Sequence, residues 1–146
     1  MSIRQNEAIA RRFEEAANTG NTADAADYIA PGFRQHGPGT PETGTGPQGF
    51  KDLINAYRTA FPDLHLTIDD MVVGEDKVAV RYRGRGTHRG EFEGIAPTGR
   101  QFETTGVDIV HIANGKITEA WQVVDSLAFW QGIGVTHLSP EAQGVR

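Results

Sequence analysis

The chain has 146 residues, a length typical of one domain, and its formal net charge is −5. This acidic balance gives no electrostatic support for nucleic-acid binding, and the lack of cysteine excludes disulfides and thiolate metal sites. No apolar run of the roughly 18 residues needed to cross a membrane is present, and the N-terminus lacks the apolar segment of a signal peptide. We therefore expect a cytoplasmic protein.

The first sixty residues have the hydrophobic spacing of helices. Residues 3–18 carry a rough apolar stripe at helical spacing, and Gly20 ends this helix. A second, short helix is predicted to start near residue 21 and to stop at Pro31. A third helix, from about residue 47 to residue 60, has the clearest core-facing stripe, formed by Phe50, Leu53, Ile54, Tyr57 and Phe61.

Residues 31–49 are rich in helix and strand breakers. They hold four of the seven prolines, so we expect an irregular segment. Irregular segments of this length are usually functional lids or mobile loops. His36 lies inside it and is either an exposed loop histidine or a site residue.

From residue 63 onward the pattern changes to the alternation of β-strands. The first strand is interrupted at Asp69 and Asp70 before it continues to residue 73. In the next strand Val78, Val80 and Tyr82 face one way, and Arg81, Arg83 and Arg85 face the other. Two following glycines allow a bend or a bulge. If the alternation survives them, His88 points inward.

A hairpin joins the last two predicted strands, residues 101–112 and 116–125, across an Asn114-Gly115 turn. A two-residue loop would place Asp108 opposite Trp121 and His111 opposite Thr118, on different faces. A longer loop would invert this assignment. Which of Asp108 and His111 points inward therefore stays open.

The end of this hairpin carries the most unusual acid of the sequence. By the period-2 rule Asp125 shares a face with Ile117, Trp121 and Val123. A carboxyl group among apolar side chains has a raised pKa, which suits acid/base chemistry. Asp125 also precedes a last short helix, so it can serve as the N-cap of that helix, and both roles can hold together.

Helices first and strands afterwards indicate an α+β fold. We expect three N-terminal helices packed in the concave face of a curved antiparallel sheet, a short C-terminal helix, and a pocket with Asp125 on its wall. Residues 1–134 would form the single domain and residues 135–146 a tail.

Three stretches carry a resemblance to a known family. They are Ala60-Phe-Pro-Asp-Leu, then Gly86-Thr-His-Arg-Gly-Glu-Phe with Gly94-Ile-Ala-Pro-Thr-Gly-Arg, and finally Asn114-Gly-Lys-Ile-Thr-Glu-Ala-Trp with Val123-Val-Asp. With them the sequence resembles the SnoaL-like polyketide cyclases, which belong to the nuclear transport factor 2-like superfamily and share its cone-shaped α+β barrel. The likeness runs from about Asn6 to Gly134.

The resemblance implies an enzyme that closes a ring by intramolecular aldol condensation without metal or cofactor, and it implies a homodimer. The acid/base aspartate of the family corresponds to Asp125, and its histidines correspond to His36 and His88. Position 111 is commonly basic in the family and is His111 here. The residue directly after the loop histidine is usually acidic or an amide in the family, and here it is Gly37. The expected ligand is small, hydrophobic and polycyclic aromatic, held by the flat walls of Trp121, Phe50, Tyr57 and Tyr82.

Two other interpretations compete with the cyclase. The same fold can serve as a non-catalytic binding or dimerisation module, since fold does not fix function. Epoxide hydrolysis would need two carboxylates and an arginine, residue types that Asp108, Asp125, Arg83 and Arg85 supply. A metal site is not expected, because the five histidines are scattered. The cyclase requires Asp125 to line a closed apolar cavity with a histidine within hydrogen-bond reach.

Overall fold

The computed structural model describes residues 2–37, 41 and 43–135. Positions 136–146 of the predicted tail lie outside the described residues, as do positions 38–40 and 42 of the segment predicted as a lid or loop. The elements, in chain order, are α1 (Ile3–Thr19), the 3-10 turn η1 (Ala25–Asp27), β1 (Ile29–His36), α2 (Gly46–Ala60), β2 (His65–Val73), β3 (Lys77–Thr87), β4 (Gln101–Ala113), β5 (Lys116–Val124) and α3 (Ser126–Gly132).

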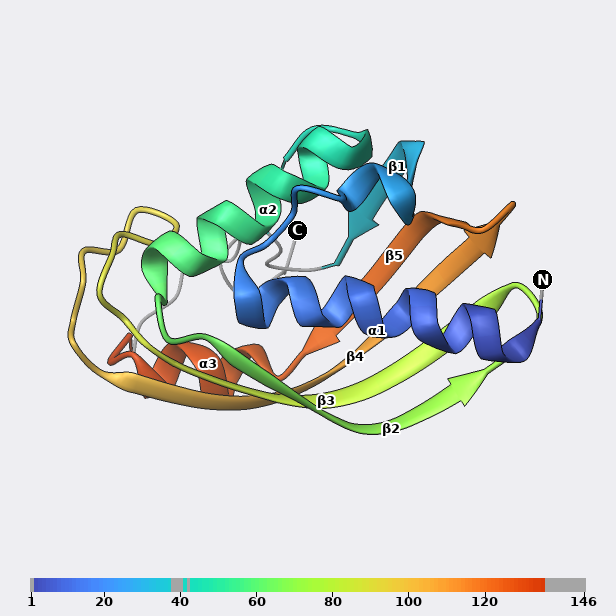
Figure 1. Ribbon diagram of the computed structural model, residues 1–146. Helices are drawn as coiled ribbons and strands as arrows, with labels where there is room; N and C mark the ends of the chain where they lie inside the picture. The colour runs from blue at the N-terminus through green and yellow to red at the C-terminus, as the bar shows by residue number, and fades with distance from the viewer. Residues whose placement is uncertain (1, 38–40, 42, 136–146) are drawn as a thin grey trace.

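The five strands form one curved sheet in the order β1-β5-β4-β3-β2 (Figure 1). Helices α1 and α2 lie on its concave face, and α3 packs beside β4 at one end. The predicted α+β fold is confirmed. Two details were wrong. The sheet is mixed rather than antiparallel, because β1 runs parallel to β5, and the second helix is only a 3-10 turn. The sheet is also open, since β1 and β2 lie at its two edges.

Strand β1 occupies part of the segment that we expected to be irregular. Ile29 and Phe33 are buried in the core, and the extended conformation of the segment goes with its pairing to β5, in which Ile29 lies opposite Ile117. Pro31 is compatible with the strand because β1 lies at the edge of the sheet and pairs on one side only.

The ends of the two long helices are fixed by specific hydrogen bonds. Ser2 and Gln5 form a capping box at the start of α1, and Gly20 ends the helix in the left-handed conformation with φ 72°. The guanidinium group of Arg58, on α2, donates to the main-chain oxygens of Ala17, Asn18, Pro62 and Leu64 at 2.7–3.2 Å. One side chain thereby ties the end of α1 to the connection between α2 and β2.

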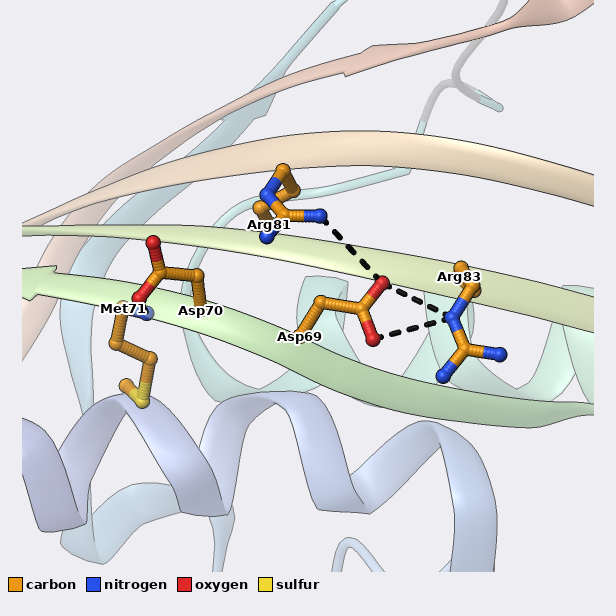
Figure 2. A network of polar contacts seen from close by, with 5 residues as sticks. All are labelled: Asp69, Asp70, Met71, Arg81 and Arg83. Atoms are coloured by element: carbon orange, nitrogen blue, oxygen red, sulfur yellow. Dashed lines mark hydrogen bonds and ion pairs between the residues drawn. The ribbon is translucent and has the colours of Figure 1, made fainter.

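Asp69 is an extra residue in β2, where the pairing shifts between Ile68 and Asp70. Its carboxylate accepts two hydrogen bonds from Arg83 Nε, at 2.9 and 3.1 Å, and lies 3.7 Å from Arg81 (Figure 2). Both arginines are exposed, which confirms the outward direction predicted for them. No bulge follows at Gly84 and Gly86, where β3 stays in register with β4. A Cβ at Gly86 would lie 2.9 Å from the ring of Phe102, so packing accounts for that glycine.

A second bulge decides which side chains of β5 face the helices. The predicted Asn114-Gly115 turn is present, with φ of 53° and 78°. Ile112 pairs with Ile117, but His111 pairs with Glu119, so Thr118 is an extra residue. The alternation of β5 therefore changes parity at Thr118, and each later side chain faces opposite to the simple period-2 prediction.

Candidate functional site

A cavity of about 110 Å³ lies between the helices and the concave face of the sheet. This volume is enough for several water molecules or for part of a larger ligand. Its walls are mainly aromatic and aliphatic and come from α1, α2, α3 and the sheet. The aromatic residues are Phe13, Phe50, Tyr57, Phe61, Tyr82, Phe92, Phe102, Phe129 and Trp130.

Three of the predicted substrate-binding residues line this cavity. Phe50 and Tyr57 reach it from α2, and Tyr82 reaches it from β3. Burial raises the pKa of both tyrosines, so their hydroxyl groups stay neutral and can donate hydrogen bonds. Tyr82 Oη also accepts a hydrogen bond of 2.9 Å from Gln122 Nε2.

The acidic part of the cavity is a pair of carboxyl groups from opposite layers of the fold. Asp108, on β4, is 2% exposed, and Glu14, on α1, is 4% exposed. The two carboxyl groups are hydrogen-bonded to each other. Asp108 Oδ1 and Glu14 Oε1 are buried and accept no hydrogen bond from an N–H or hydroxyl donor of the described residues. Such orphaned oxygens in a cavity are available to a bound ligand.

Burial controls the protonation of this pair. It raises the pKa of Asp108 to about 6, although hydrogen bonds with Glu14 and Gln122 act in the opposite direction. Burial also raises the pKa of Glu14 well above its ordinary value, and the neighbouring Asp108 charge raises it further. No lysine, arginine or histidine is among the described residues that line the cavity. No cation there offsets the cost of the negative charge.

Asp125 does not line this cavity, and its predicted position in an apolar pocket was wrong. Its side chain is exposed and accepts a hydrogen bond of 3.1 Å from Ala128 N. It therefore caps α3, which is the other role that the sequence allowed. The cause of the error is the extra residue Thr118, since the parity change turns position 125 toward the outer face.

The same parity change moves Trp121 and its neighbours to the outer face of the sheet. Trp121 is 48% exposed, and the ring of His36 stacks on it at a centroid distance of 4.1 Å. His36 Nε2 also lies 2.8 Å from Glu119 Oε2. His111 alternates with the buried Val110 and Ile112 and so faces outward too. The sequence predicted that Trp121, His36 and His111 line an apolar pocket together with Asp125, and that prediction was wrong.

His88 is buried, as the alternation predicted, but it is not part of the cavity wall. Its Nδ1 accepts a hydrogen bond of 3.3 Å from Thr98 N, and its ring packs on Phe61. The backbone of His88 also pairs with Arg100 and Gly99. In this position His88 fixes the connection between β3 and β4.

The structure does not bring together the residues that epoxide hydrolysis would need. Arg83, Arg85 and Asp125 line a separate hollow of about 320 Å³ on the outer face, whereas Asp108 faces the cavity on the opposite side of the sheet. The residue set considered for epoxide hydrolysis is thus divided between the two faces of the sheet.

Within the described part of the chain, no three His, Asp or Glu residues are grouped as metal ligands would be. No helix of that part is long and apolar enough to cross a membrane.

Sequence reasoning missed Glu14 altogether and left Asp108 undecided. A signal for Glu14 was present, because it lies among Ala10, Phe13 and Ala17 at helical spacing, on the face that packs against the sheet. The direction of Asp108 follows from the burial of Val110 and Ile112, which lie two and four residues further along β4 and share its face.

Comparison with known proteins agrees with this architecture. The family model described as SnoaL-like polyketide cyclase matches residues 7–133. The chain is 37% identical over 114 residues to aklanonic acid methyl ester cyclase AcmA of Streptomyces galilaeus, covering 75% of this chain and 77% of the relative. It is 29% identical over 139 residues to aklanonic acid methyl ester cyclase DnrD of Streptomyces peucetius, covering 91% and 93%.

Solved structures show the same fold. TsrD from Streptomyces laurentii superposes with a TM-score of 0.82 at 27% identity, over 92% of this chain and 98% of that one. IdmH from Streptomyces antibioticus superposes with a TM-score of 0.74 at 33% identity, over 90% and 99%. The family match covers nearly all of the described residues, and the two sequence relatives are named as cyclases. The chain therefore belongs to the SnoaL-like polyketide cyclase family, as its sequence predicted.

Proposed function

We propose that the protein closes a ring in a polyketide-like substrate by intramolecular aldol condensation, with Asp108 as the acid/base group. The observation that supports this most directly is the position of Asp108. It is a buried carboxyl group in an aromatic-lined cavity, and burial raises its pKa to about 6. A general base works best when its pKa lies near the working pH.

The cavity suits the rest of this reaction. An aldol closure needs a proton taken from a carbon next to carbonyl groups and the two reacting carbons held together. Flat walls such as Phe50 and Phe61 would hold a planar, apolar ring system. The neutral hydroxyl groups of Tyr57 and Tyr82 are hydrogen-bond donors for a developing enolate oxygen.

The names of the relatives suggest the first substrate to test. Two of them are named as aklanonic acid methyl ester cyclases. We propose that this chain accepts the same class of substrate, a polycyclic polyketide methyl ester. The lack of a cation among the described cavity residues supports a neutral ester over a carboxylate, which the acidic pair would repel.

The test compares two isosteric substitutions, Asp108→Asn and Asp125→Asn, with aklanonic acid methyl ester as the substrate and product formation followed by chromatography with mass detection. Asp108→Asn should lower kcat at least about 10²-fold, because it removes the base. Asp125→Asn should keep the wild-type kcat, since asparagine also caps helices well. Full activity in Asp108→Asn would refute the role of Asp108, and a loss of activity in folded Asp125→Asn would return the catalytic role to Asp125.

A binding module would give a different pattern. The wild-type protein would then bind the ester in calorimetry without forming product, and Asp108→Asn would bind it at least as tightly.

We further propose that the protein is a homodimer formed through the outer face of the sheet. The support is a group of exposed apolar side chains there: Val107, Ile109, Trp121 and Val123. Sedimentation equilibrium should give twice the chain mass, and Trp121→Ser should shift the protein toward monomer. A wild-type monomer at all concentrations would refute this part.

A further inference from the structure

We infer that Glu14 is a second catalytic residue and that Glu14 and Asp108 work as a pair holding one proton. In this pair Asp108 takes the proton from the substrate carbon, and Glu14 gives a proton to the carbonyl oxygen that is attacked. The inference rests on the proposed aldol chemistry, and it assigns the acid that this reaction needs in addition to its base.

The geometry of the pair carries this inference. Glu14 comes from α1 and Asp108 from β4, so the two side chains approach the cavity from opposite layers and meet in it. Each is almost fully buried, and a hydrogen bond joins the two carboxyl groups. A hydrogen bond between two carboxyl groups requires a proton on one of them. Two adjacent buried carboxylates would repel each other, so one proton is retained.

The surroundings of the pair favour the same state. Tyr57 on α2 and Tyr82 on β3 are the titratable groups that face it across the cavity, and both are neutral. Gln122 on β5 and Gln35 on β1 are uncharged. The described lining contains no cation that would stabilise a second negative charge at neutral pH. Burial and the Asp108 charge both raise the pKa of Glu14, which makes Glu14 the member that keeps the proton.

Each carboxyl group also has an oxygen that the described protein donors leave unsatisfied. Glu14 Oε1 and Asp108 Oδ1 are buried and accept no hydrogen bond from an N–H or hydroxyl group. Both side chains line the same cavity, so one ligand can contact both carboxyl groups. A purely structural carboxyl pair would be expected to have these oxygens satisfied by protein donors.

The reaction then balances within the pair. Asp108 carboxylate accepts a proton from the carbon between carbonyl groups, and the C–H electron pair becomes the enolate. The enolate carbon bonds to the second carbonyl carbon, whose C=O π bond opens, and that oxygen takes the proton of Glu14 to become a hydroxyl group. Asp108 is left protonated and Glu14 ionised. One proton transfer through their hydrogen bond restores the starting state without an outside acid or base.

The first experiment measures the protonation state of the Glu14 carboxyl group and needs no activity assay. The protein carries ¹³C-labelled glutamate side chains, and the Glu14 carboxyl carbon is followed by NMR as a function of pH. We expect the Glu14 signal to show a protonated group at pH 7 and to disappear in Glu14→Gln. The control is Glu15→Gln, the same substitution at the exposed neighbouring position on α1, which should leave the signal unchanged.

The second experiment separates catalysis from positioning. Glutamine at position 14 keeps the size of the side chain and can still donate a hydrogen bond to Asp108, but it cannot supply a proton. We expect Glu14→Gln to lower kcat about 10²-fold or more with KM changed less than about threefold. The wild-type profile of kcat/KM against pH should rise through about 6 and fall as Glu14 ionises. Glu14→Gln should lose the falling part, and Glu15→Gln should match wild type.

The outcomes distinguish this inference from the function on which it rests. If the wild-type protein forms product and Asp108→Asn does not, but Glu14→Gln keeps the wild-type kcat, the role of Glu14 is overturned and the cyclase proposal stands. An ionised Glu14 at pH 7 overturns the one-proton pair directly. If no substrate of this class is cyclised although Glu14 is protonated, the proposed function falls, and the catalytic role of Glu14 falls with it.

Discussion

Replacing Asp108 with asparagine should make the folded protein more stable at pH 7. In the unfolded chain an aspartate has a pKa near 3.8, whereas burial raises the pKa of Asp108 to about 6. Each pKa unit corresponds to about 1.4 kcal/mol, so the ionised group costs the folded state about 3 kcal/mol. Asparagine removes this cost at nearly equal volume. For a domain of this size, that corresponds to roughly 6–12 °C in Tm.

The gain should depend on pH in a defined direction. Below about pH 4 the carboxyl group is protonated in both states, and Asp108→Asn should equal the wild type. Between about pH 4 and pH 6 the unfolded state releases the proton first, so the wild type loses stability as pH rises while the variant does not. Above this window the difference should stay near about 3 kcal/mol.

Urea denaturation at pH 4, 5, 6, 7 and 8, followed by tryptophan fluorescence, measures this difference directly. The control is Asp52→Asn at an exposed position on α2, which should change stability by less than about 0.5 kcal/mol at every pH. A destabilised Asp108→Asn variant at pH 7, or a gain that does not change with pH, would refute the reasoning. In that case the carboxyl group would be stabilised where it lies, and its role as a base would lose its physical support.

Three further substitutions test other parts of the structure. Arg58→Ala should lower the free energy of unfolding by about 2–4 kcal/mol in urea denaturation, because it leaves four main-chain oxygens without their charged donor. The control, Arg11→Ala on the exposed side of α1, should have little effect. Gly106→Ala should cost about 1–3 kcal/mol and lower kcat, since the new Cβ would lie 2.6 Å from Tyr82 Oη and displace it; an unchanged kcat would mean that Tyr82 does not contact the substrate. Asp125→Ala should lower stability by about 0.5–2 kcal/mol through loss of the α3 cap, with kcat unchanged, and a loss of kcat in the folded variant would contradict the outer position of this residue.

The sequence predicted most of the fold because its periodicities are local. The stripe from Phe50 to Phe61 and the alternation from Val78 to Tyr82 each follow from burial of one face, and the structure has a helix and a strand there. The strand β1 could not be predicted in the same way. Its position depends on pairing with β5, more than eighty residues later in the chain, and two breakers, Pro31 and Gly32, hide it locally.

The site was harder to predict because it depends on one inserted residue and on a contact between layers. The turn at Asn114-Gly115 was predicted correctly, yet the extra residue Thr118 shifts the register just beyond it, and no sequence signal marks that bulge. The pairing of Glu14 with Asp108 joins the first helix to the fourth strand, which period rules for single elements do not reveal. The family likeness predicted the membership in the SnoaL-like family, whereas the pair of Glu14 and Asp108 could be identified only from the three-dimensional structure.

The bulge at Thr118 also bears on how this fold can change over time. If Thr118 instead paired as an ordinary strand residue and the bulge were lost, every later residue of β5 would change face, so that Trp121 and Val123 would turn toward the cavity while Gln122 and Val124 would turn toward solvent. The part of the cavity wall beside Asp108 would then be replaced with no change at the residues that form it. The presence or absence of this one bulge is therefore a short route by which relatives with the same fold can acquire different ligands.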